Sequence, residues 1–144
     1  MKKIYKILIY LILFGLLCGF GVYMYVFHKP HRNVGREKPA FTMTAPELIK
    51  AFSEKEDASY KMYGDKALQI TGKIADIAKK GNDITITLED QTSGVSCSFE
   101  AEYFQKNGDK INALKVGDQI TVKGKCDGYD MIMGVVLTRC VIPE

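Results

Sequence analysis

Three cysteines, Cys97, Cys126 and Cys140, are the side chains with the most chemistry to offer. Three thiolates could bind a metal, but a tetrahedral zinc site needs a fourth ligand, and no two of these cysteines have CxxC spacing. In an oxidising compartment we expect one disulfide and one free thiol instead. The spacing favours Cys126–Cys140, with Cys97–Cys140 as the alternative if the chain turns tightly after Cys126. In a reducing compartment all three would remain thiols.

Residues suited to catalysis are scarce. His28 and His31 are the two histidines, and neither has a cysteine, an aspartate or a third histidine near it in the sequence. Asp127 and Asp130 flank Gly128, where aspartate favours a turn for backbone reasons. The chain has no Ser-His, Cys-His or phosphate-loop pattern. We therefore expect no cofactor, no metal site and no enzymatic activity.

The charges are segregated along the chain. Residues 1–40 carry seven Lys and Arg against one acidic residue, whereas residues 41–144 carry 13 against 16. Binding to a phosphate backbone needs clustered basic residues, so an acidic domain makes nucleic acid an unlikely partner. Four lysines on the first and fourth predicted strands could still form a ligand face, opposite the usual site: Lys66, Lys73, Lys123 and Lys125.

The N-terminus predicts a membrane anchor. After a short basic tail, residues 1–6, residues 7–27 contain no charge in 21 positions, and a helix of that length is about 31 Å long. Cleavage at Gly19-Phe20-Gly21 or lipidation at Cys18 is less favoured, because the apolar run continues past both. Gly15 and Gly19 have the spacing of a weak helix-dimer contact. Residues 28–40, with two prolines, a glycine and mixed charge, predict a linker.

Hydrophobic periodicity organises the remainder, residues 41–144, as one domain. A Thr44–Glu47 capping box opens a helix that runs to Tyr63 and ends at Gly64 in a left-handed position. The predicted barrel elements are a strand over 68–74 bent at Gly72, a turn at 79–83, strands over 84–88 and 95–99, a helix over 100–114 interrupted near Asn107-Gly108, a strand over 120–126, a turn at Asp127-Gly128 and a strand over 135–142. This order predicts a mainly β, five-stranded OB-fold Greek-key barrel.

Nucleic-acid OB-folds bind across the outer face of their second and third strands through aromatic and basic side chains. The outward positions on these strands should be Thr85, Thr87, Glu89, Ser96, Ser98 and Glu100. None of them is aromatic or basic. This face therefore gives no support to nucleic-acid binding.

Four segments carry a family resemblance: YKMYGDKALQITGKIADI from residue 60, GVSCSFEAE from 94, LKVGDQITVKGKCDG from 114 and VVLTRCVI from 135. Together with HKPHRNV after the anchor, they resemble the tRNA-anticodon-like OB-fold family of bacterial envelope proteins, described as OB-fold lipoproteins. Cys18 departs from the lipoprotein pattern, because it lacks the small residue that precedes a lipidated cysteine.

The resemblance and the residues together predict a location and a role. A very short N-terminal tail favours a single-pass protein of the bacterial inner membrane, with its domain on the outer, periplasmic side. The first hypothesis for function is a non-enzymatic module that binds an unknown protein or envelope component. The alternative is a membrane-tethered binder of single-stranded nucleic acid or a charged oligosaccharide.

Overall fold

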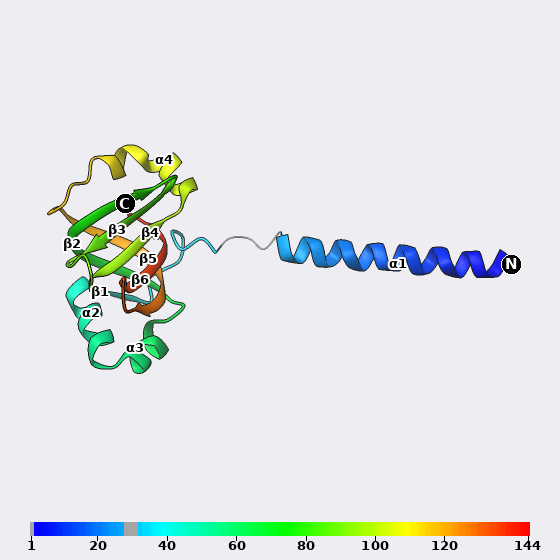
Figure 1. Ribbon diagram of the computed structural model, residues 1–144, viewed down its shortest axis with the longest axis horizontal. Coiled ribbons are helices and arrows are strands. Elements are labelled where there is room, and N and C mark those ends of the chain that lie inside the picture. Colours follow the sequence, from blue (N-terminus) through cyan, green and yellow to red (C-terminus); the bar gives the residue numbers. More distant parts are fainter. Residues whose placement is uncertain (1, 28–31) are drawn as a thin grey trace. The chain divides into compact units, whose positions relative to one another are not determined.

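The computed structural model describes residues 2–27 and 32–144, and the chain divides into two units between Arg32 and Asn33. The first unit is the helix α1, Lys2–Phe27 (Figure 1). Its stretch Lys3–Phe27 is long and apolar enough to cross a membrane. The basic tail predicted as a separate segment is helical from Lys2 onward, so Lys3 and Lys6 belong to the helix. Lysines near the end of a spanning helix can extend their ammonium groups to the head groups.

The second unit contains a closed barrel of five strands. These strands are β2 Ala67–Lys80, β3 Asp83–Leu88, β4 Val95–Phe99, β5 Gln119–Asp130 and β6 Gly134–Val141. β2 pairs antiparallel with both β3 and β5, β3 with β4, and β5 with β6, while β4 and β6 run parallel. The ring β2-β3-β4-β6-β5 therefore closes on itself, which confirms the predicted OB-fold.

The alternation along the strands explains why the barrel forms. Ile84, Ile86 and Leu88 on β3 are buried, and their partners on β4 are buried with them. Gly72, where the sequence predicted a bend, is a point of close approach, because a Cβ there would lie 2.8 Å from the Cβ of Ala45. Two residues further on, the β2–β3 register shifts, so the strand bends around the barrel and pairs with β5 as well as β3.

Helices lie at both ends of the barrel, with α2 Ala45–Glu54 and α3 Glu56–Tyr63 at one end and α4 Ala101–Asn112 at the other (Figure 1). α4 fills the predicted position between the third and fourth barrel strands, and its interruption is a kink at Asn107. The single helix predicted from Thr44 to Tyr63 was wrong, because the backbone leaves helical geometry at Lys55.

Capping at Thr44 agrees with the sequence pattern. The Glu47 carboxylate accepts hydrogen bonds from the backbone N–H and the hydroxyl of Thr44, at 2.8 and 2.9 Å. These two hydrogen bonds lower the pKa of Glu47, and the bond from the Thr44 backbone has the larger effect. The left-handed residue after α3 is Asp65, with φ of 59°, and not Gly64. Gly64 is needed for a different reason, since a Cβ there would lie 2.5 Å from the carbonyl oxygen of Tyr60.

The turn predicted at Asp127-Gly128 was also wrong. Both residues lie inside β5, where the register with β6 shifts between Cys126 and Gly128. A bulge places a glycine with φ of 116° at that point, so the Asp-Gly pair serves the bulge and not the hairpin turn. The chain reverses three residues later, over residues 131–133, and Gly134 then begins β6.

The domain begins earlier than residue 41, where the predicted linker ended. Val34 is 2% exposed, and the buried ammonium of Lys123 donates to the carbonyl oxygens of Gly35 and Glu37, at 2.6 and 3.0 Å. The following strand β1, Phe41–Thr44, pairs in parallel with β2. The segment from Asn33 is therefore part of the second unit. Of the remaining linker residues, 28–31 lie outside the described part of the chain.

Candidate ligand-binding groove

An open groove of about 820 Å³ lies over the outer face of the barrel. It covers the second and third barrel strands, β3 and β4, and continues over β6 and β5. Thr85 and Ser98 are cross-strand neighbours in its floor. The lining residues are Lys80, Asp83, Thr85, Ser98, Phe99, Glu100, Lys125, Asp127, Thr138 and Arg139. This is the face that OB-folds use for binding.

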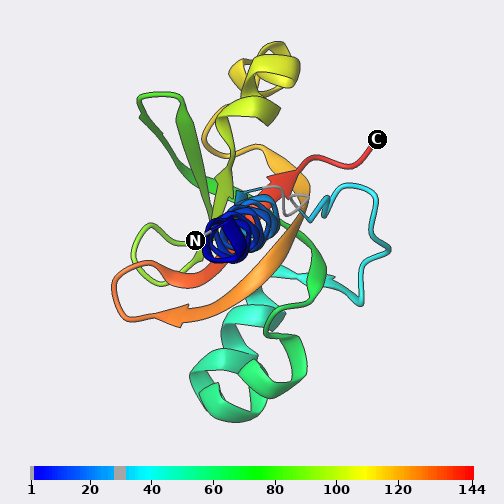
Figure 2. The same cartoon turned by 90° about the vertical axis from the view of Figure 1, so that its right-hand side faces the viewer.

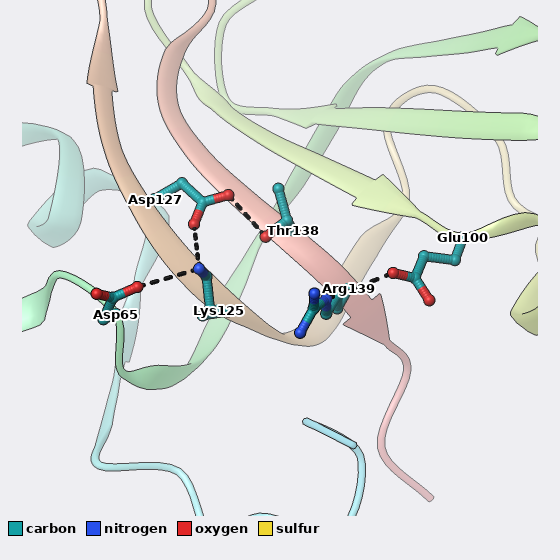
Figure 3. A network of polar contacts seen from close by, with 6 residues as sticks. All are labelled: Asp65, Glu100, Lys125, Asp127, Thr138 and Arg139. Atoms are coloured by element: carbon teal, nitrogen blue, oxygen red, sulfur yellow. Dashed lines mark hydrogen bonds and ion pairs between the residues drawn. The ribbon is translucent and has the colours of Figure 1, made fainter. Parts of the chain in front are cut away.

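Lys125 lies at the centre of a polar network at one side of the groove. Figure 3 shows its Nζ between two carboxylates, 3.0 Å from Asp65 and 2.8 Å from Asp127. The other oxygen of Asp127 accepts a hydrogen bond from the Thr138 hydroxyl at 2.7 Å. The hydrogen bonds to Asp127 and then to Asp65 raise the pKa of Lys125. The ammonium is therefore held in place by two carboxylates that neutralise its charge.

Arg139 forms the second ion pair of the groove, with its Nε 3.5 Å from a Glu100 oxygen (Figure 3). Its backbone has a φ of 52°, at a register shift between β5 and β6. The groove lining thus contains three basic side chains (Lys80, Lys125 and Arg139) and three acidic ones (Asp83, Glu100 and Asp127). Its formal charge is zero, so it offers no net attraction to a polyanion.

The structure brings together about half of the outward residues that the sequence predicted. Thr85, Ser98 and Glu100 line the groove, whereas Thr87 and Ser96 are only 9% and 3% exposed. Glu89 lies outside it, and its carboxylate accepts a hydrogen bond from the backbone of Lys73. Sequence reasoning missed the contribution of the last strand, Thr138 and Arg139. The available signal was the two polar residues that interrupt the apolar run of VVLTRCVI.

The four lysines proposed as a ligand face do not form one patch. Lys66 donates to the carbonyl oxygen of Met62 at 2.6 Å, near the start of β2, while Lys73 lies seven residues along the chain. Lys123 is 9% exposed and held by two backbone carbonyls. Lys125 is the one member of this set that lines the groove.

The domain cysteines are buried free thiols. Cys126 lies opposite Leu137 in the β5–β6 ladder, whereas the thiol of Cys140 lies close enough to Cys97 for the two groups to interact. Burial raises the pKa of Cys126 to about 11, and it also raises the pKa of Cys140. All three side chains are buried in the core of the barrel. The disulfide stays a prediction, and this arrangement favours the Cys97–Cys140 alternative.

The described part of the chain contains no cluster of metal-binding side chains. Within residues 2–27 and 32–144, no group of three or more His, Cys, Asp or Glu is placed to bind a metal ion. His28 and His31 lie outside these ranges. The groove is the candidate site, because its lining side chains can form hydrogen bonds and ion pairs with a ligand.

A closed five-stranded barrel with this strand order defines a protein of the OB-fold class. The chain belongs to the tRNA_anti-like family, whose model matches residues 1–142. No curated protein matches the chain in sequence.

A solved structure shows the same fold. A lipoprotein from Klebsiella pneumoniae, described as nucleic acid-binding, superposes with a TM-score of 0.56 at 18% identity, over 71% of this chain and 91% of that chain. The Stn1-ten1 complex of S. pombe superposes with a TM-score of 0.41 at 17% identity, over 53% of this chain and 57% of that chain. A protein of Leishmania major described as an aspartyl-tRNA synthetase superposes with a TM-score of 0.47 at 14% identity, over 70% of this chain and 20% of that chain.

Proposed function

We propose that the protein is a membrane-anchored binding module without catalytic activity, located at the bacterial inner membrane with its barrel on the outer side. The helix α1 supports the anchor, because its stretch Lys3–Phe27 is long and apolar enough for a membrane span. The protein should stay with membranes after carbonate washing, and its mass should include residues 1–27. A mature N-terminus near Val22 would contradict the anchor.

The charge balance of the groove carries the proposal for its ligand. A groove with three basic and three acidic side chains suits a ligand that itself carries both charges and many hydrogen-bonding groups. A segment of another protein meets this description, whereas a polyphosphate chain would meet the carboxylates of Glu100 and Asp127. We therefore propose a protein of the envelope as the ligand.

Filling the groove tests this proposal. Ser98 is partly exposed in the groove floor, so Ser98→Tyr should block the groove without entering the core. Thr42→Tyr, on the exposed side of β1, adds the same side chain outside the groove. After crosslinking in native membranes, the wild type and Thr42→Tyr should capture the same protein, and Ser98→Tyr should not. Equal capture by all three would reject the groove as the binding site.

The second candidate is a tethered binder of single-stranded nucleic acid or a charged oligosaccharide. It is supported by the three basic groove residues, Lys80, Lys125 and Arg139, and by the similarity to a lipoprotein that is described as nucleic acid-binding. This function requires micromolar binding to single-stranded DNA or RNA, or to a polyanionic sugar, that weakens steeply with added salt. The protein-binding proposal expects no such binding at about 0.1 M salt.

A further inference from the structure

The tip of the β5–β6 hairpin is an exposed apolar loop. Met131 is 93% exposed, Ile132 81%, Met133 42% and Tyr129 37%. In Figure 2 the hairpin, orange passing into red, projects from the barrel as a separate loop. We refer to these four residues as the apolar tip. Consecutive exposed apolar side chains such as these are typical of surfaces that contact a protein or a membrane.

Folding of the turn does not require these side chains. The Asp130 carboxylate accepts hydrogen bonds from the backbone N–H groups of Ile132 and Met133, at 2.8 and 3.0 Å. Gly134 supplies a φ of 72°, and a side chain there would collide with the carbonyl oxygen of Gly94. Aspartate and glycine thus build the turn from either side. The side chains between them are left free to serve a contact.

We propose that the apolar tip inserts into the interfacial layer of the bilayer to which the domain is tethered. This inference rests on the membrane anchor of the proposed function. Methionine and isoleucine gain by leaving water, and a tyrosine places its ring at the level of the head groups with its hydroxyl still hydrated. The lipid surface is thus a second contact of the domain, separate from the groove.

The length of the tether supports lipid as the occupant. Five residues, 28–32, separate the last residue of α1 from Asn33, and a fully extended chain of that length spans about 20 Å. A domain of this size has a radius of gyration of about 13 Å. An anchored domain therefore remains beside the bilayer, at a high effective concentration of lipid. An insertion too weak to recruit a free domain can then be well populated.

The charges near the tip define the type of lipid contact. Between Asp127 and Thr138 the charged residues are Asp127 and Asp130, and the segment has no lysine or arginine. The segment itself therefore offers no basic side chain to anionic head groups. The insertion should depend on apolar burial and should occur in zwitterionic phosphatidylcholine.

Tryptophan fluorescence can test the insertion directly, because the chain has no tryptophan of its own. Ile132→Trp places a probe at the tip. Val116→Trp is the matched control, since Val116 is 63% exposed and precedes β5 at its other end. The full chain is reconstituted into phosphatidylcholine vesicles with and without brominated acyl chains.

We expect brominated lipid to quench the Ile132→Trp emission several-fold more strongly than that of Val116→Trp, with a blue shift for the tip probe alone. This quenching should not require anionic lipid. Equal quenching of the two probes in phosphatidylcholine would overturn the inference. So would a photocrosslinker at position 132 that captured a protein and not lipid in native membranes.

Vesicle flotation of the same samples separates the two proposals. A chain that floats with the vesicles but keeps an unquenched tip probe contradicts the insertion and leaves the anchor intact. A chain that does not float contradicts the anchor and the insertion together. Replacing Met131, Ile132 and Met133 by serine should leave the tip exposed to water. The chain should still float with the vesicles, because α1 still holds it in the bilayer.

Discussion

Replacing Glu100 with Gln and Asp127 with Asn in one chain should turn the groove into a salt-sensitive site for single-stranded DNA. These two carboxylates face Arg139 and Lys125, at 3.5 and 2.8 Å. Their neutralisation changes the formal charge of the groove lining from zero to +2. Both replacements keep an oxygen acceptor of similar shape, so the Thr138 hydroxyl retains a partner in the Asp127→Asn chain.

The expected magnitude follows from the number of cations released. We assume that two side chains, Arg139 and Lys125, each contact a phosphate. A plot of the logarithm of the binding constant against the logarithm of the salt concentration should then have a slope of about −1.4. Affinity should then drop about sevenfold between roughly 0.05 and 0.2 M salt. The ion-paired side chains are 22–54% exposed, so losing each pair should cost stability only about 0–1 kcal/mol.

Fluorescence anisotropy of a labelled oligothymidine, measured with the domain from Asn33 to Glu144, provides the assay. This part of the chain forms one compact unit with its own core. The matched control is Glu102→Gln with Asp109→Asn on α4, which changes the net charge equally outside the groove. Binding should appear in the groove variant alone. Equal binding by both variants, or steeply salt-dependent binding by the wild type, would refute the role assigned to the groove charges.

Three further predictions concern the barrel and its loops. Gly124→Ala should lower the free energy of unfolding by about 1–3 kcal/mol in denaturant titration, because the new Cβ would lie 2.6 Å from the sulfur of Cys140. In an exported domain, thiol counting should find one free domain thiol, because Cys97 and Cys140 form a disulfide. This disulfide closes a loop of about 44 residues and should contribute roughly 4 kcal/mol to the free energy of unfolding. The Asp90 carboxyl should titrate at a pH of about 2 by NMR. Hydrogen bonds lower its pKa from 3.8, and the bond from the Thr92 backbone has the largest effect.

Each of these predictions has a control or a contradicting result. Gly108→Ala, within α4, meets Phe104 at an ordinary 3.5 Å and should stabilise the domain by about 0.5–1 kcal/mol. Three free domain thiols in protein from native membranes would contradict both the disulfide and the exported orientation. A depressed pKa for Asp90 means that its contribution to stability is present above pH 3.8 and is lost as the pH falls through about 2. Titration of Asp90 near 3.8 would contradict its loop contacts.

The barrel was predictable from sequence because its strands are half-buried. A strand with one face in the core must alternate apolar and polar residues, as residues 84–88 do, and a tight barrel needs a bend such as Gly72. β1 was missed because four residues carry too little periodicity, and its partner in β2 lies more than 20 residues away. Parallel pairing of this kind leaves no turn signal between the strands.

The groove was only partly predictable, because backbone irregularities determine which side chains reach it. Asp127-Gly128 has the composition of a hairpin turn, but a bulge places it within β5. Arg139 lies at a left-handed backbone position inside β6, which strand alternation does not anticipate. Lys123 appeared to be a surface lysine, yet two carbonyls from residues more than 80 positions away allow it to be buried.

The central claim is that the groove of a membrane-anchored barrel binds another protein. A photocrosslinking amino acid at position 85 in the groove floor, activated in native membranes, tests this claim most directly, with position 110 on the exposed side of α4 as the control. The account predicts a discrete protein adduct from position 85 that is absent at position 110. A nucleic-acid adduct from position 85, or the same adducts from both positions, would contradict it.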